Sequence, residues 1–329
     1  MTTRRKFLAA LGASIAAPGM LIAQEQNHKR SWWNYIFNDN KTAPAPFHPN
    51  PQTWSNATIT AAWIGHSTIF INFFGTHIIT DPVFSERVGV NILGLVTVGP
   101  KRLVKPALKF DELPPIDLIL VSHAHMDHCD LPTLKRFSLD TPVIVAKNTA
   151  DVLDGLDFKK IYELDWEEKI MIGDVEIEGL QVKHFGWRYP WEEDRSRGNR
   201  NGRSYNAYRV SKNGKTIVFG GDTAYQEFFK KLKERNIPVE LAMMPIGTYN
   251  PWIRNHATPE QSLAMADQMG ARNFLPMHWG TFIQSDEPVH EPIERLKKAV
   301  TTEHIVLDTI GQTWSLTGNA TSSPTVSST

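Results

Sequence analysis

A single ten-residue stretch of this chain collects most of the side chains that could do chemistry. VSHAHMDHCD, residues 121–130, follows an apolar run typical of a strand and contains His123, His125, Asp127 and His128. Loops that follow strands often carry sites, because the strands hold them rigidly. If the backbone stays extended, His123 and His125 point the same way and can reach one ion, while the next two side chains can serve a second. Imidazole and carboxylate groups suit zinc, so the motif predicts a zinc centre rather than an ion-free surface cluster.

Two ions need more ligands than this motif supplies. Three candidates each stand at the end of a further apolar run: His184 after EGLQVK, Asp222 after TIVFGG and His278 after NFLPM. The two oxygens of a carboxylate can each face one metal, which makes Asp222 the natural bridge. Together these residues form a seven-ligand set for two zinc ions, a kind of site that supports hydrolysis.

Short strands must position these residues. From Ala57 the apolar runs TITAAWI, TIFINFF, THIITD and DLILVS suit strands joined by tight turns at Gly65 and Gly75. After the metal motif, helical and strand patterns alternate, and EHIVLDTIGQTWSL is expected to close a sheet. We therefore expect one α/β domain over residues 57–314.

One helix is predicted with both of its ends. In TPEQSLAMADQMG, Thr258 is the expected N-cap and Pro259 occupies the first helical position. Gln261 completes a capping box with Thr258, and Gly270 is expected to end the helix.

The two ends of the chain differ from its centre. Residues 1–23 begin with TTRRKFL, continue with an Ala/Gly-rich apolar segment, and resemble a twin-arginine export signal rather than an uncleaved anchor. Residues 24–56 are expected to form an N-terminal arm over the core, whose Trp32 and Trp33 pack inside or touch a membrane. Residues 315–329 form a polar tail that we expect to be disordered. The sequence thus predicts a periplasmic or otherwise exported protein.

Composition excludes some classes of protein. Lys+Arg and Asp+Glu both number 35, so the formal net charge is zero, whereas nucleic-acid-binding proteins usually carry a marked basic excess. Nucleic acid is therefore not expected as a partner. The one cysteine, Cys129, cannot form an internal disulfide. It is expected to be a small buried residue rather than a metal ligand or nucleophile.

The metal motif, followed by His184, Asp222 and His278, resembles the metallo-β-lactamase superfamily. The blocks around it are similar to one branch, the N-acylphosphatidylethanolamine-hydrolysing phospholipase D enzymes and their bacterial relatives. These blocks are WIGHSTIFI, TDPVFSERV, VGPKR, LPPIDLILVSHAHMDH, FGGDTAY, MPIGTYNP and MHWGTF, and the similarity covers about residues 54–300. The resemblance implies an α/β fold, a four-layer αββα sandwich with the metals at one edge of the paired sheets.

The resemblance also implies a role for each ligand. It assigns His123, His125 and His184 to one zinc, Asp127, His128 and His278 to the other, and Asp222 to both as a bridge. Relatives with a di-iron centre have glutamate where His125 stands, so His125 favours zinc. Asp81, in TDPVF, would orient a metal-bound imidazole, because such a partner fixes the tautomer of the ring. His66, in WIGHST, would do the same or be a core histidine.

Three residues are predicted to be catalytic: Asp127, Asp222 and His256. His256 matches a histidine that lines the pocket in the branch, and its hypothetical role is that of general acid for the leaving oxygen, against a hydrogen-bonding role at the rim. The preceding Asn255 stands where the animal enzymes have glutamine, which leaves substrate positioning open.

The segment 185–204, FGWRYPWEEDRSRGNRNGRS, directly follows His184. It could form a lid whose Trp187, Tyr189 and Trp191 face acyl chains while an arginine pairs with a phosphate. The alternative is a solvated loop whose mixed charges keep it soluble. Trp252 and Ile253 would likewise either extend an apolar groove or pack inside.

The function implied by the resemblance is hydrolysis of a phosphodiester by two zinc ions. The expected substrate is an N-acylphosphatidylethanolamine-type phospholipid, which would give phosphatidate and an N-acylethanolamine. One alternative is a lactone, carboxyl-ester or β-lactam hydrolase on the same site, and a less favoured one is a non-enzymatic exported zinc-binding protein. Seven ligands around two ions leave positions open, unlike a closed structural zinc site. The sequence leaves peripheral membrane contact and a dimer, known in the branch, open.

Overall fold

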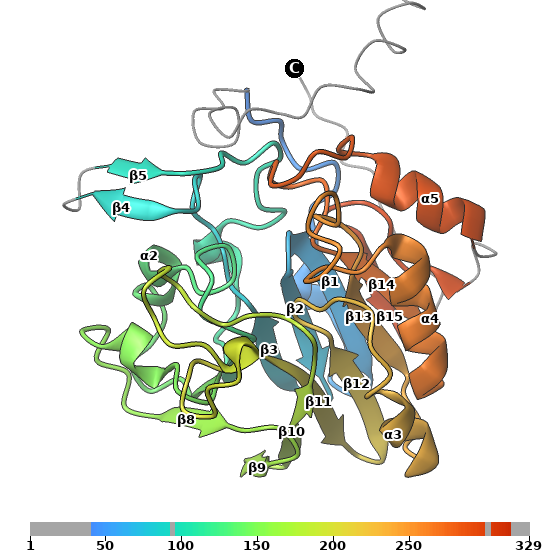
Figure 1. Cartoon of the computed structure of the whole chain (residues 1–329). Helices are drawn as coiled ribbons and strands as arrows, with labels where there is room; N and C mark the ends of the chain where they lie inside the picture. Colours follow the sequence, from blue (N-terminus) through green and yellow to red (C-terminus); the bar gives the residue numbers. More distant parts are fainter. Residues whose placement is uncertain (1–40, 93–95, 300–303, 317–329) are drawn as a thin grey trace, which may run out of the picture.

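The computed structural model describes residues 41–92, 96–299 and 304–316, which form two large sheets packed face to face (Figure 1). The first sheet has seven strands in the order β15-β1-β2-β3-β6-β7-β8. Their bounds are β1 Ile59–Gly65, β2 Thr68–Phe73, β3 Thr76–Thr80, β6 Leu118–Val121, β7 Val143–Ala146, β8 Ile161–Leu164 and β15 Thr313–Ser315. The second has six strands in the order β14-β13-β12-β11-β10-β9. Their bounds are β9 Lys169–Ile172, β10 Val175–Gln181, β11 Asn206–Lys212, β12 Lys215–Phe219, β13 Leu241–Pro245 and β14 Phe274–Met277.

Helices and a small ribbon complete the described part of the chain. The α-helices are α2 Leu131–Leu134, α3 Lys230–Glu234, α4 Pro259–Met269 and α5 Glu291–Ala299. Short 3-10 helices span Pro51–Thr53, Phe110–Glu112, Ala150–Leu153 and Arg195–Arg197. The strands β4, Val90–Ile92, and β5, Val96–Val98, pair in a ribbon that projects from the body (Figure 1).

Strand β6 shows why the fold has several layers. All four of its residues are buried, so the strand reads as a continuous apolar run with both faces covered. Because side chains alternate along a strand, Leu118 and Leu120 join the core between the two sheets, while Ile119 and Val121 join a second core on the outer face. Helix α2 contributes Leu134 to that outer core.

The second sheet is covered in the same way. In β12, Ile217 and Phe219 face the core between the sheets, whereas Val218 packs with residues of α3, α4 and α5. Figure 1 shows these three helices along the outer side of this sheet. The layers are therefore helix, sheet, sheet and helix, which confirms the predicted αββα sandwich.

Local predictions also agree with the structure. Gly65 and Gly75 have φ angles of 133° and 82° and lie at the predicted turns. Helix α4 begins after Thr258, whose hydroxyl accepts a hydrogen bond from the backbone of Gln261 while the Gln261 side chain accepts one from Thr258. Gly270, at φ 70°, ends the helix in the left-handed conformation that glycine adopts without strain.

The chain ends are described only in part. The predicted export signal, the arm up to residue 40, which includes Trp32 and Trp33, and the tail from residue 317 lie outside the described residues. Within them, Trp54 stacks on Phe70 with ring centroids 5.1 Å apart, and the backbone of Ala43 bonds to Leu103 and Lys105. Strand β15 runs to Ser315, one residue past the predicted domain end. No helix in this part of the chain is long and apolar enough to cross a membrane.

Candidate metal centre

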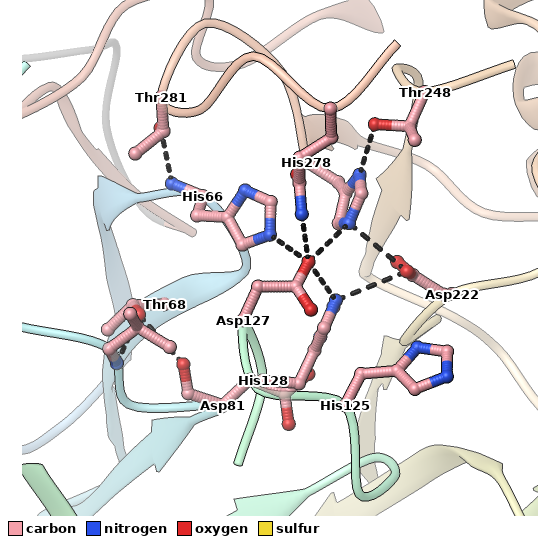
Figure 2. A network of polar contacts seen from close by, with 12 residues as sticks. His66, Thr68, Asp81, His125, Asp127, His128, Asp222, Thr248, His278 and Thr281 are labelled. Carbon is pink, nitrogen blue, oxygen red and sulfur yellow. Dashed lines mark hydrogen bonds and ion pairs between the residues drawn. The ribbon is translucent and has the colours of Figure 1, made fainter. Parts of the chain in front are cut away.

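The predicted ligands meet at one edge of the two sheets. Strands β1, β3 and β6 run in the same direction in the first sheet, and β10, β12, β13 and β14 share a direction in the second. Each delivers a polar residue just past its carboxyl end: His66, Asp81, His123, His184, Asp222, Thr248 and His278. Figure 2 shows His125, Asp127, His128, Asp222 and His278 converging there. Four of these turns are tight, because His66, Asp81, Thr248 and His278 all have positive φ.

One group of three histidines converges first. Nδ1 of His125 lies 2.7 Å from Nε2 of His123 and 3.3 Å from Nε2 of His184. One nitrogen from each of the three rings could hold a common ion. The structure thus brings together the residues predicted for the first metal.

The second group surrounds Asp127. Its Oδ2 atom lies 3.5 Å from Nε2 of His128 and 3.5 Å from Nε2 of His278. Asp222 lies between the groups: its Oδ2 atom is 3.1 Å from Nε2 of His128, 3.1 Å from Nε2 of His278 and 3.8 Å from Nε2 of His184. Asp222 thus lies near histidines of both groups, as the predicted bridge would.

Several polar atoms of this cluster are buried without a hydrogen-bond partner in the described part of the chain. They are Nε2 of His125, His128 and His278 and Oδ1 of Asp222. Buried polar atoms are rarely left unpaired in proteins, and imidazole and carboxylate are zinc ligands. The residues therefore fit a metal centre, and the ligand assignments remain predictions.

A set of neighbours orients the ligands. Asp81 accepts hydrogen bonds from Nδ1 of His128 at 2.6 Å, from the Ser122 hydroxyl at 2.6 Å and from the Ser122 backbone at 2.7 Å. The backbone carbonyl of Asn255 accepts from Nδ1 of His184 at 2.9 Å. Such partners fix the tautomer and orientation of metal-binding rings. The contact made by Asn255 uses its backbone, so it does not depend on the departure from glutamine.

His66 is buried, as the predicted alternative of a core histidine requires, and it also contacts a predicted ligand. Its Nε2 atom is 3.0 Å from Oδ2 of Asp127, so this polar contact is with a carboxylate rather than with an imidazole. Three neighbours were missed by sequence reasoning: Ser122, Thr248, which lies 3.4 Å from Nδ1 of His278, and Gln284, which donates to Asp127. No local motif marks Thr248 and Gln284, because each contacts a residue distant in the sequence. Ser122 contacts its neighbour His123, at 2.8 Å.

Charges inside the cluster are strongly coupled. Burial would raise the pKa of Asp222, but His128 and His278 outweigh it and hold this pKa well below its usual range. Burial would lower the pKa of His278, but Asp222 and Asp127 raise it to about 9, and carboxylates also raise the pKa of His128 well above its usual value. The pKa of His125 falls to about 3, mainly through burial. The cluster thus favours positive charge beside its two carboxylates.

We expect metal binding to release protons. His278, with a pKa of about 9, is protonated in the metal-free protein near pH 7.5, whereas an imidazole ligand must be neutral. An ion therefore displaces the proton, and zinc affinity should fall as the pH drops from 9 towards 6. Calorimetry of zinc binding in buffers of different ionisation enthalpy measures this release. Binding at pH 7.5 that releases no proton would contradict the expectation.

His256 lies beside the cluster. Its side chain is buried, its Nδ1 atom has no hydrogen-bond partner among the described residues, and that atom is 3.8 Å from Oδ2 of Asp222. Burial lowers the pKa of His256 well below its usual value, despite the opposing effect of Asp222. The ring is therefore uncharged near neutral pH and available to a group that enters the site.

The segment 185–204 is tied down by its own hydrogen bonds. The buried carboxylate of Asp194 accepts from the backbones of Gly186 and Trp187, at 2.5 and 2.7 Å. Arg188 donates to the backbone carbonyls of Ala124 and Cys129, at 2.8 and 2.9 Å, both within the stretch 121–130 that carries the metal motif. These bonds form an organised loop beside the site.

In this loop, three arginines bind other protein groups, two aromatic rings lie near His125, and one tryptophan is exposed. Arg195 pairs with Asp165, and Arg203 pairs with Asp151 and Glu192, so with Arg188 three of its arginines already have protein partners. The ring centroids of Phe185 and Trp187 lie 4.4 and 5.9 Å from that of His125. Trp191 is 79% exposed and stacks on Tyr189.

The remaining sequence predictions concern Cys129 and the groove. Cys129 is fully buried, and burial raises the pKa of its thiol to about 11, which agrees with an unreactive structural residue. Trp252 and Ile253 are 51% and 45% exposed, so they do not pack inside. The Trp252 carbonyl accepts a backbone hydrogen bond from His256, in the turn that leads to that residue.

The fold and the site match known proteins. The family described as "Beta-lactamase superfamily domain" matches residues 76–279. An uncharacterised protein of Mycobacterium tuberculosis is 29% identical over 276 residues, which cover 80% of this chain and 70% of that protein. N-acyl-phosphatidylethanolamine-hydrolyzing phospholipase D 1 of Caenorhabditis elegans is 29% identical over 283 residues, 79% of this chain and 76% of that one.

Two further matches extend the comparison. The mitochondrial N-acyl-phosphatidylethanolamine-hydrolyzing phospholipase D of Saccharomyces cerevisiae is 32% identical over 255 residues, which cover 74% of this chain but about half, 52%, of the yeast protein. The crystal structure of an isothiocyanate hydrolase from Delia radicum gut bacteria has a TM-score of 0.62 at 15% identity, over 78% of this chain and 98% of that one. At that identity the likeness concerns the fold alone.

The family match covers more than half of the chain, and the structure adds both the sandwich and a His/Asp cluster that fits a metal. The chain therefore belongs to the β-lactamase superfamily and is a metal-dependent hydrolase of that fold.

Proposed function

We propose that this protein is a di-zinc phosphodiesterase that cleaves an N-acylphosphatidylethanolamine-type phospholipid into phosphatidate and an N-acylethanolamine. The observation that carries the proposal is the position of Asp222 between two groups of ligands, 3.1 Å from His128 and His278 and 3.8 Å from His184. Six side chains arranged around one carboxylate suit two ions better than one.

Some residues of the site would hold the metal ions, and others orient those ligands. His123, His125 and His184 would hold one zinc, Asp127, His128 and His278 the second, and Asp222 both. A zinc pair supplies Lewis acidity and a water nucleophile at neutral pH. Asp81 keeps Nδ1 of His128 protonated, which leaves its Nε2 atom free to face the site. Phe185 and Trp187 pack near His125 and cover part of that side of the cluster.

The lipid assignment has two supports. Two relatives at 29% and 32% identity are named for N-acylphosphatidylethanolamine hydrolysis. Exposed apolar side chains also occur in the segments that lead to and from the site: Trp252 and Ile253 shortly before His256, and Trp191 on the loop that follows His184. Exposed apolar groups at a site rim suit acyl chains, and the same groups would give the protein peripheral contact with a membrane.

The proposal is tested by metal content and a substrate panel. Zinc in the protein would be measured by elemental spectrometry, followed by turnover of bis(p-nitrophenyl) phosphate, an N-acylphosphatidylethanolamine and a lactone. We expect about two zinc ions per chain and cleavage of both phosphodiesters. Turnover of the lactone alone would indicate that the protein is an acyl hydrolase rather than a phosphodiesterase. Zinc without turnover of any of the three substrates would overturn the proposed phosphodiesterase activity.

We further propose that His256 assists the leaving oxygen. Its ring, uncharged in the resting site, would take up a proton in the course of the reaction and donate it to that oxygen, and a positioned acid-base group contributes about 10²-fold or more. We expect His256→Gln to lower kcat by about 10²-fold for the phospholipid and much less for bis(p-nitrophenyl) phosphate, because p-nitrophenolate leaves without protonation. Equal losses on both substrates would indicate a rim contact. Unchanged turnover and an unchanged pH profile in this variant would show that His256 has no catalytic role.

The proposed location is the periplasm, reached by the twin-arginine route. Arg4 and Arg5, followed by the apolar segment up to Ala23, support it. Fractionation of cells that carry the wild-type chain or the Arg4→Lys, Arg5→Lys double variant tests this. We expect the variant to stay in the cytoplasm, and equal export of both chains would contradict the twin-arginine route.

A further inference from the structure

One oxygen of Asp127 is held by two residues outside the predicted ligand set. Oδ2 accepts a hydrogen bond from Nε2 of Gln284 at 2.7 Å and lies 3.0 Å from Nε2 of His66. The same atom is 3.5 Å from the ring nitrogens of His128 and His278. Asp127 therefore enters the cluster in an orientation that its neighbours determine.

The Gln284 contact joins residues 157 positions apart in the sequence. The side-chain nitrogen must face Asp127, because the amide oxygen in its place would oppose a carboxylate oxygen. The amide oxygen, Oε1, is buried and has no hydrogen-bond partner in the described part of the chain. The contact with Asp127 is thus the interaction that the Gln284 side chain makes at the site.

The loop that carries Gln284 is fixed from several directions. The Gln284 carbonyl accepts a hydrogen bond from Nε1 of Trp252 at 3.3 Å. Three residues further on, the buried carboxylate of Glu287 accepts from the backbones of Thr248 and Asn250, at 2.5 and 3.1 Å. A side chain on a backbone fixed in this way can position a carboxylate, because little conformational freedom remains to be lost.

We propose that Gln284 is a positioning residue that holds Asp127 in its ligating orientation and thereby strengthens the binding of one metal ion of the pair. The inference rests on the proposed di-zinc site. It predicts an asymmetric effect: loss of the amide weakens the ion held by Asp127, His128 and His278, while the ion held by the three histidines is retained. Loss of a residue that supports a ligand typically lowers metal affinity about 10- to 100-fold.

The test uses Gln284→Met, which keeps the length of the side chain and removes the donor. Zinc affinity would be measured in the full chain by competition with a chromophoric chelator. We expect one of the two ions to bind about 10- to 100-fold more weakly in the variant and the other to be unchanged. The visible spectrum of the cobalt-loaded protein should change in parallel, because the geometry of one ion is altered.

Gln268→Met provides the matched control. Gln268 lies in α4, is also partly buried, and donates to the Tyr225 hydroxyl at 3.0 Å while its own amide oxygen is buried without a partner. We expect this variant to bind both ions as the wild type does. If Gln284→Met fails to fold, Gln284→Asn, whose shorter side chain withdraws the amide from Asp127, should show the same selective loss.

Two failures can be told apart. If a folded Gln284 variant binds each ion as tightly as the wild type does, the positioning role is overturned. It is also overturned if the variant binds both ions more weakly to the same extent. A wild-type protein that binds no second ion would instead contradict the proposed di-zinc function.

Discussion

Asp222→Asn is expected to lower kcat/KM for bis(p-nitrophenyl) phosphate by about 10³-fold or more and to reduce the zinc content below two ions per chain. Asp222 is buried and lies within 3.1 to 3.8 Å of histidines from both ligand groups. A neutral amide can neither bridge two cations nor balance the charge of the histidines around it. Metal Lewis acidity contributes several kcal/mol to such reactions, and each 1.4 kcal/mol is about tenfold in rate.

Asp308→Asn is the control for this variant. Asp308 is partly buried and pairs with Lys297 of α5 at 2.6 Å, so its replacement should leave zinc content and turnover unchanged. Circular dichroism and thermal unfolding of the metal-free proteins would show whether the Asp222 variant folds. A folded variant that keeps two zinc ions and wild-type turnover would refute the bridging role.

Asp81→Asn is expected to weaken zinc binding about 10- to 100-fold and to destabilise the protein by roughly 1–3 kcal/mol. The fully buried carboxylate accepts three hydrogen bonds, two from Ser122 and one from His128. An amide nitrogen cannot accept a hydrogen bond. If it replaces Oδ1, the Ser122 backbone N–H loses its acceptor, and if it replaces Oδ2, both the Ser122 hydroxyl and Nδ1 of His128 lose theirs. In the second case the His128 ring also loses the partner that fixes its tautomer.

Asp130→Asn separates the two effects. Asp130 is also a buried carboxylate, and it accepts hydrogen bonds from the hydroxyls of Ser85 and Thr133 rather than from a predicted ligand. We expect a comparable loss in the free energy of unfolding with unchanged zinc affinity. Chelator competition and denaturant unfolding would be measured for both variants. Equal zinc affinities for the two would show that Asp81 serves stability alone.

The sequence by itself determined the features that depend on neighbouring residues. The cap and stop of α4 could be predicted because Thr258, Gln261 and Gly270 act within one helix. The candidate ligands could be found because each follows an apolar strand, and strand ends are visible as the end of an apolar run. The family resemblance then supplied the pairing of the ligands, which spacing alone leaves open.

Only the tertiary structure decided which distant groups touch the ligands. Gln284 reaches Asp127 across 157 residues, and Asp81 reaches His128 across 47, through contacts made where parallel strands end at one edge. The same packing occupies Arg188 with the carbonyls of Ala124 and Cys129, whereas the sequence suggested only that some arginine of segment 185–204 could pair with a phosphate. The physical reason is that a hydrogen bond depends on distance and direction between two side chains, and the path of the backbone between them leaves no local pattern in the sequence.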